Sequence, residues 1–123
     1  MTIIEAINQV DELRRNAISQ KQKIIWLSRC EAAVKNRVVD KYEGAEEISF
    51  SGFDSSTDLK TELIMPEPFD EAYIHYLSAQ IYFSQQELES YNSEISMYEV
   101  FLNGFKSWWS ETHMPVGERR FRF

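Results

Sequence analysis

The sequence is poor in the residues that build metal sites, disulfides and nucleotide-binding loops. It holds one cysteine, Cys30, two histidines, His75 and His113, and only four glycines. A single cysteine excludes an internal disulfide framework and a zinc site with several cysteines. The histidines lack metal-ligand spacing, and four scattered glycines cannot form a glycine-rich phosphate loop. We therefore expect no catalytic residue, no cofactor and no metal, and predict that the protein is not an enzyme.

Long apolar runs are missing as well. No segment approaches the roughly 18 apolar residues of a membrane span, and residues 1–5 lack the basic region of a signal peptide. Hydrophobic residues make up 43% and charged residues 27%, which argues against disorder. A chain of 123 residues fits one domain. The sequence thus predicts a single domain over residues 1–123 with no membrane partner.

Positive charge is scarce in the middle of the chain, and the net charge of the whole is −7. Residues 43–71 hold one basic and nine acidic side chains. By contrast, residues 1–42 hold eight basic and five acidic side chains, and residues 113–123 hold three and one. Because phosphate contacts need Lys and Arg, a protein with this balance is a poor general binder of nucleic acid.

The N-terminal third predicts two helices. Thr2 and Glu5 have the spacing of a capping box, which begins a helix over residues 3–13. Ser19 caps a second helix, and Gly44 is a typical signal for its end.

The second helix carries two apolar stripes. The stronger one consists of Ile24, Leu27, Cys30, Val34 and Val38. The other is spaced by seven residues on roughly the opposite side and consists of Ile25, Ala32 and Val39. Two stripes fit a central helix with neighbours on both faces, and they fit a helix at a subunit interface equally well. In the second case Ile25, Ala32 and Val39 contact the neighbouring subunit.

Residues 43–69 lack a helical pattern. Glycines, prolines and the turn-rich run 54–58 interrupt them, and the apolar residues around Ile48 and 63–65 favour short extended pieces such as a hairpin. Connections of this length in a compact domain are usually disordered or functional, and the apolar content favours a binding loop. Its candidate residues for binding a partner are Glu46, Glu47, Phe50, Phe53, Asp54 and Asp58.

Aromatic residues crowd the C-terminal half. A third helix begins near Asp70, residues 91–93 predict a break, and a fourth helix follows to about Glu111. Ten aromatic side chains lie within residues 72–109. Most of them fill a helical core, but Trp108 and Trp109 cannot share one helix face. We therefore add this pair to the expected subunit interface.

The C-terminal tail, residues 114–123, ends in alternating basic and aromatic side chains. These are Arg119, Arg120, Phe121, Arg122 and Phe123. Stacking on nucleic acid and a frayed terminus are alternatives, but we favour docking onto a protein partner. The fold predicted from all segments is all-α: a small bundle of about four helices, a long acidic loop between helices 2 and 3, and an extended tail.

Several segments together form a pattern of helices, prolines and aromatics. They are the opening helix 3–13, residues 23–28 and 48–53, Glu87, Tyr91-Asn92, His113-Met114-Pro115 and, most strongly, Leu63-Ile64-Met65-Pro66-Glu67-Pro68-Phe69-Asp70-Glu71-Ala72-Tyr73-Ile74-His75-Tyr76-Leu77. In this pattern the chain resembles the small head–tail connector (adaptor) proteins of tailed bacteriophages and prophages of Gram-positive hosts, over nearly its full length.

The resemblance implies a non-enzymatic structural protein that assembles as a closed ring, dodecameric in the virion, under the portal protein. Such a ring extends the DNA channel, passes double-stranded DNA without sequence-specific contact, and offers a surface to the next connector, stopper or tail protein. It also implies synthesis in the host bacterial cytoplasm and localisation at the head–tail junction of the virion. Other classes stay open: a small phage-encoded interaction or regulatory module, a tail-completion or stopper protein, and a helical enzyme with an unrecognised carboxylate site.

Overall fold

A computed structural model describes residues 1–113 of the chain. Within them the chain forms four α-helices and two short 3-10 helices: α1 (Ile3–Leu13), α2 (Gln20–Arg37), η1 (Val39–Lys41), η2 (Ala45–Glu47), α3 (Glu71–Ser84) and α4 (Leu88–Thr112). This confirms the predicted all-α bundle. Residues 1–113 contain no strand, only an isolated bridge between Thr2 and Glu62. The predicted docking tail lies outside the described residues.

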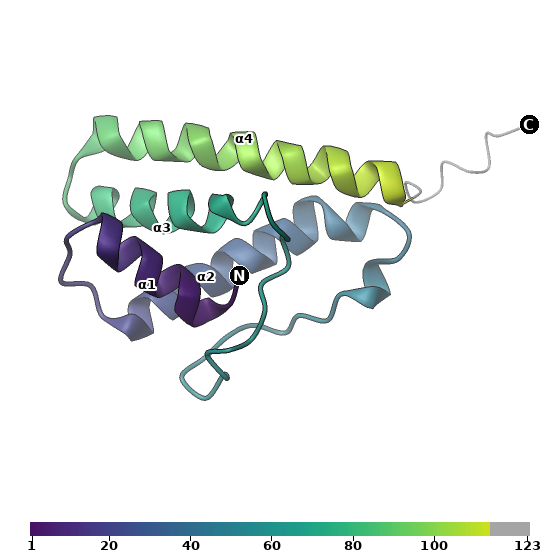
Figure 1. Cartoon of the computed structure of the whole chain (residues 1–123), viewed down its shortest axis with the longest axis horizontal. Coiled ribbons are helices and arrows are strands. Elements are labelled where there is room, and N and C mark those ends of the chain that lie inside the picture. Colours follow the sequence, from purple (N-terminus) through teal and green to yellow (C-terminus); the bar gives the residue numbers. More distant parts are fainter. Residues whose placement is uncertain (114–123) are drawn as a thin grey trace, which may run out of the picture.

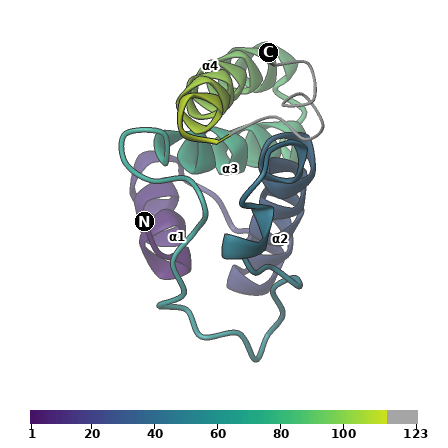
Figure 2. The same cartoon turned by 90° about the vertical axis from the view of Figure 1, so that its right-hand side faces the viewer.

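The helices are stacked in three tiers (Figure 1). α4 runs antiparallel to α3, and Figure 2 shows α3 lying between α4 and the pair α1 and α2. α3 therefore contacts each of the other three α-helices. The connection between η2 and α3 loops out beyond α1 and α2, on the side of the molecule away from α4.

The core follows from this stacking, because α3 is enclosed on most of its surface. Its buried residues are Ala72, Tyr73, Ile74, Leu77, Ser78, Ala79 and Ile81. The predicted main stripe of α2 is buried as well: Ile24, Leu27, Cys30, Val34 and Val38 all belong to the core. The connection adds Leu63 and Met65 to the same core, which fixes its last third against the helices.

The first helix begins as predicted. The Thr2 hydroxyl accepts from the amide of Glu5, and the Glu5 carboxylate accepts from the amide of Thr2, which is the reciprocal pattern of a capping box. Ser19 caps α2 in a similar way, through the amide of Gln22. At both helix starts, a hydroxyl side chain accepts a hydrogen bond from the backbone amide three residues later.

The predicted end of the second helix at Gly44 is wrong. α2 ends at Arg37, the backbone leaves helical geometry at Val38, and η1 follows. This tight turn carries both Val38 and Val39 into the core, where they are 1% and 0% exposed. Gly44, with a φ of 95°, instead precedes η2.

The predicted break at residues 91–93 is also wrong, because these residues lie inside α4. The reversal between α3 and α4 comes earlier, where Gln86 has a φ of 61°. The amide of Glu87 bonds to the carbonyl of Tyr82 (2.9 Å) and that of Gln86 to the carbonyl of Phe83 (3.0 Å). These two bonds form a Schellman motif, which normally has glycine where this chain has Gln86.

Candidate functional site

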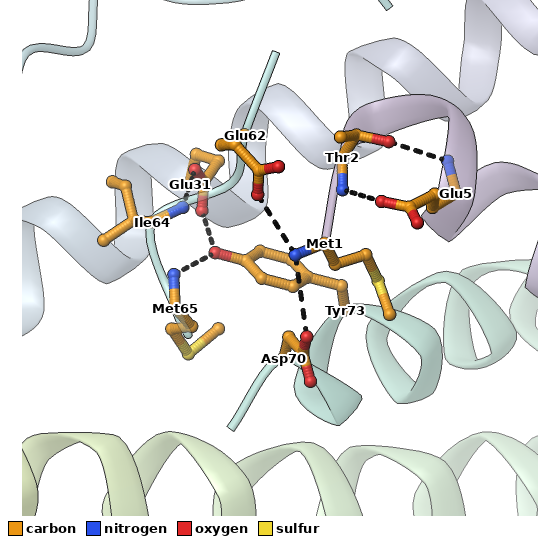
Figure 3. A network of polar contacts seen from close by, with 9 residues as sticks. All are labelled: Met1, Thr2, Glu5, Glu31, Glu62, Ile64, Met65, Asp70 and Tyr73. Atoms are coloured by element: carbon orange, nitrogen blue, oxygen red, sulfur yellow. Dashed lines mark hydrogen bonds and ion pairs between the residues drawn. The ribbon is translucent and has the colours of Figure 1, made fainter. Parts of the chain in front are cut away.

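A buried carboxylate ties the long connection to the bundle (Figure 3). Glu31, on α2, is 1% exposed. One of its oxygens accepts from the amide of Ile64 (2.8 Å), and the other accepts from the hydroxyl of Tyr73 on α3. The Tyr73 hydroxyl in turn accepts from the amide of Met65 (2.9 Å). Three separate segments thus meet at one acid.

Burial dominates the electrostatics of this network. It raises the pKa of Glu31 to about 7, although the hydrogen bonds from Tyr73 and Ile64 act in the opposite direction. Burial and the nearby Glu31 carboxylate also raise the pKa of the Tyr73 hydroxyl. The sequence interpretation missed Glu31, yet its position between Leu27 and Val34 on the main stripe of α2 was an available signal.

The first residues of the chain are hydrogen-bonded to residues 61–63 of the same connection. The amide of Ile3 bonds to the carbonyl of Thr61 (3.1 Å), and that of Leu63 to the carbonyl of Met1 (2.9 Å). The amino group of Met1 lies 3.3 Å from Glu62 and 3.6 Å from Asp70. Residues 59–65 are therefore a strap held on α1, α2 and α3.

The predicted binding residues of the connection fall into separate places. Glu46 and Glu47 are exposed on η2, and Glu47 lies 3.7 Å from Nε2 of His113. The rings of Phe50 and Phe53 pack edge to face, with centroids 5.1 Å apart. Glu46 and Glu47 thus belong to η2, and the aromatic pair lies further along the connection.

The two predicted aspartates of the connection organise turns. The Asp54 carboxylate accepts from the Ser56 hydroxyl (2.6 Å) and amide (2.8 Å). These bonds hold the pKa of Asp54 below its usual value. Asp58 accepts from the amide of Lys60 (2.9 Å). Both carboxylates are exposed, so they shape the loop and also give its surface negative charge.

One groove is lined by residues from both the predicted subunit interface and the predicted binding loop. Ile25, from the second stripe of α2, faces Phe53 and Asp54 of the connection across a hollow of about 350 Å³. The other residues that line it are Gln20, Lys21, Ile24, Ser55 and Leu59. This volume lies within the range of small-ligand and peptide sites.

Two of the predicted subunit contacts are buried inside the single chain, and for them the prediction is corrected. Val39 is 0% exposed because the turn after α2 directs it inward, and Trp109 is 5% exposed because it packs on Phe105 and His113. Ala32 is exposed and Ile25 half-buried. Trp108 is 40% exposed, as expected for a residue about 100° around the helix from Trp109.

Trp108 belongs to an apolar stripe that the sequence interpretation did not identify. Met97, Val100, Gly104 and Trp108 fall within about 80° of arc on α4, and Val100 is 60% exposed. Phe69 packs against this stripe, 6.0 Å from the Trp108 ring between centroids. A Cβ at position 104 would lie 3.2 Å from the Phe69 ring, so Gly104 makes room for it. We call Met97, Val100, Trp108 and Phe69 the α4 flank.

An acidic hollow lies next to the α4 flank. It has a volume of about 320 Å³ between the starts of α1 and α3, and its lining residues are Met1, Glu5, Gln9, Glu67, Asp70 and Glu71. Figure 2 shows the segment that leads into α3, which carries Phe69, passing beside α4 on the α1 side. Phe69 of the α4 flank and three of the acidic lining residues, Glu67, Asp70 and Glu71, therefore come from the same short segment of the chain.

A second polar cluster joins α4 to α3 and to the residue that follows α1. Glu94 of α4 lies 2.9 Å from the guanidinium of Arg14 and 2.6 Å from Nδ1 of His75. The His75 ring stacks on Phe101, and Arg14 lies over the Tyr82 ring. Each charged group here is paired within the chain, which is typical of a structural contact between helices.

The part of the chain that the structure describes has no metal-binding cluster, no thiol that is ionised near neutral pH and no helix suited to span a membrane. Residues 1–113 contain no cluster of His, Cys, Asp or Glu that could hold a metal ion. Burial raises the pKa of Cys30, so its thiol stays protonated near neutral pH. None of the helices within residues 1–113 has both the length and the apolar character needed to span a bilayer.

Comparison with family models, curated proteins and solved structures gives no match to this chain.

Proposed function

We propose that this protein is a non-enzymatic assembly protein, which joins copies of itself into a ring and serves as a head–tail connector under a portal protein. The observation that supports this most directly is the α4 flank. Trp108, Val100 and Met97 face solvent in one stripe. On a small protein, exposed apolar side chains that share one helix face favour a surface for another protein, and Trp and Met are enriched at such contacts.

A ring requires two different surfaces on each subunit. The α4 flank is one, and the groove between Ile25 and Phe53 is a second. They lie on different sides of α3, because the connection loops out away from α4 (Figure 1). When the first surface of each copy binds the second surface of the next, the same contact repeats around an axis. The copies form a closed ring when the rotation angle between neighbours is a whole fraction of 360°.

The assignment to head–tail connectors rests on the resemblance of the sequence. In this proposal the ring sits under the portal protein, and the next connector, stopper or tail protein binds its far side. The acidic connection, residues 43–69, contacts one of these rings or faces the DNA channel. In the channel, its carboxylates would repel the phosphates and let DNA slide.

The assembly is tested by mixing the purified protein with purified portal protein and imaging the mixture by electron microscopy. The proposal predicts added density of ring symmetry on one end of the portal. Portal particles that stay unchanged at a large excess of this protein would contradict the connector function.

The channel role of the connection is tested by changing its charge. Glu46→Lys and Glu47→Lys reverse exposed charges, while Asp54→Asn and Asp58→Asn keep an acceptor for the turns. We expect slower DNA ejection from particles that carry all four changes, and no change for the matched surface variant Glu12→Lys. Retention and ejection that equal wild type would remove the acidic connection from the channel, but not the ring.

A second candidate is an interaction module that acts as a monomer or dimer on another protein. The groove at Ile25 favours it, since its volume and apolar lining suit a short peptide segment. The same imaging experiment separates the two, because a module of this kind forms no ring and does not bind the portal.

A further inference from the structure

Exposed acidic side chains border the α4 flank. Residues 62–112, which form the strap end, α3 and α4, hold nine acidic side chains and one basic side chain, Lys106. Four of the nine are paired with cations from elsewhere in the chain: Glu62 and Asp70 with the amino group of Met1, Glu94 with Arg14, and Glu99 with Arg37. Glu67 and Glu71 are exposed and line the acidic hollow. An occupant of this surface needs apolar groups for the flank and positive charge for its border.

The sequence contains one segment with this combination. Residues 114–123 carry three arginines and one glutamate, and the arginines alternate with Phe121 and Phe123. Arginine forms paired hydrogen bonds with carboxylates, and arginine and aromatic residues dominate binding energy at protein interfaces. Charge and side-chain type therefore match the tail to the α4 flank and its acidic border.

We propose that the tail of one copy binds the α4 flank of a second copy. Its arginines pair with Glu67 and Glu71, and its phenylalanines pack on Trp108 and Phe69. This rests on the proposed ring assembly and names the contact that links successive subunits.

A second copy is favoured over the chain's own flank by the way α4 ends. The His113 ring stacks on Trp109 at 3.6 Å and lies close to Gly44, so the last described residue faces the segment between η1 and η2. Trp108 points about 100° away from Trp109 around the helix. A tail that starts beside η2 would have to cross over α4 to reach its own flank, whereas the flank of a neighbour can approach it directly.

The contact is tested with a fluorescent peptide of residues 114–123 added to the full-length protein. Anisotropy should report binding, and the patch variant Glu67→Lys with Glu71→Lys should weaken it at least about tenfold, equivalent to about 1.4 kcal/mol. A control pair with the same charge change, Glu87→Lys with Glu89→Lys at the far end of α4, should bind as wild type does. No binding to wild type, or equal loss in the control pair, would overturn the proposal.

A charge swap distinguishes a neighbour from the chain's own flank. The tail variant carries Arg119→Glu, Arg120→Glu and Arg122→Glu, and each variant alone should associate more weakly in sedimentation velocity. An equal mixture of tail variant and patch variant should recover association, since each tail then meets a flank of opposite charge on another copy. A mixture as weak as its components would overturn docking between copies.

The portal experiment separates this inference from the proposed function. A tail variant that still forms rings on the portal as wild type does would refute the tail contact and leave the connector function standing. Peptide binding that depends on Glu67 and Glu71, without any ring on the portal, would refute the connector function and leave the contact standing.

Discussion

At Glu31 the core of the bundle holds a carboxylate where an apolar side chain would pack. The acid is retained with satisfied hydrogen bonds, from Ile64 and Tyr73, which is the condition under which a buried polar group is tolerated. In exchange it fixes the strap, residues 59–65, in one position. Because a buried charge is costly, the same residue makes the stability of the fold depend on pH.

The sign of this dependence follows from the raised pKa. Glu31 titrates near 4.5 when unfolded and at about 7 when folded, so the folded state binds the extra proton between these values. The free energy of unfolding should therefore fall as pH rises from about 4.5 to 7, by about 3 kcal/mol from this group. Urea unfolding of wild type across this pH range measures the loss.

Glu31→Gln should remove most of that slope, because the amide resembles the protonated acid and does not titrate. The matched control, Glu12→Gln on the surface of α1, should show the same pH dependence of unfolding free energy as wild type. If Glu31→Gln and wild type lose stability in parallel between pH 4.5 and 7, the buried carboxylate is not the source.

Tyr73→Phe removes the hydroxyl that links Glu31 to the amide of Met65. The two groups lose a buried partner, so we expect a loss of about 1–3 kcal/mol in unfolding free energy. Tyr82→Phe is the control, since its half-exposed ring keeps its place under Arg14. An equal effect of the two substitutions in thermal melts would argue against the network.

At the scale of elements, the turn between α3 and α4 carries local strain. Gln86 adopts a positive φ that glycine accepts without a Cβ penalty. Gln86→Gly should therefore stabilise the protein by about 0.5–1 kcal/mol, as calorimetry would show. Gln85→Gly, at a φ of −92°, should destabilise it. A melting temperature that falls in both variants would contradict the Schellman geometry.

Helix starts were predictable because each is encoded locally. The capping pairs Thr2 with Glu5 and Ser19 with Gln22 place the first residues of α1 and α2, and the main stripe of α2 identifies its core face. The all-α class follows from the same periodic patterns.

Helix ends and exposure were not predictable, because they depend on tertiary contacts. α2 stops where two valines turn inward together, and α4 starts early at a turn that lacks its usual glycine. Val39 looked like surface on a continuous helix and is core. The α4 flank was missed because Met97 and Val100 are ordinary residues until the packing of α3 leaves that side uncovered. The Trp108 and Trp109 pair could be flagged, but not which of the two is buried.

At the scale of the whole molecule, the two candidate surfaces lie on different sides of α3. The middle of the acidic connection loops out on the side away from α4, whereas its end, with Phe69, packs beside α4 and the exposed flank (Figures 1 and 2). A small protein with distinct surfaces on opposite sides is suited to stacking between different partners. The proposed connector function depends on this arrangement, because a connector must bind one partner on each side.

The adjacent tryptophans provide a matched pair for testing it. Trp109 is enclosed by Phe105 and His113, so Trp109→Ala should cost about 3–5 kcal/mol of stability, measured by urea unfolding. Trp108→Gln with Val100→Gln changes exposed side chains on the same helix and should alter the melting temperature much less. Similar losses in the two variants would mean that the flank belongs to the core.

Sedimentation velocity over a range of concentrations, alone and with portal protein, tests the α4 flank most directly. Wild type should form higher assemblies, and the Trp108→Gln, Val100→Gln variant should remain folded but largely monomeric. Assembly of this variant equal to wild type, or a wild type that stays monomeric under every condition, would contradict the account.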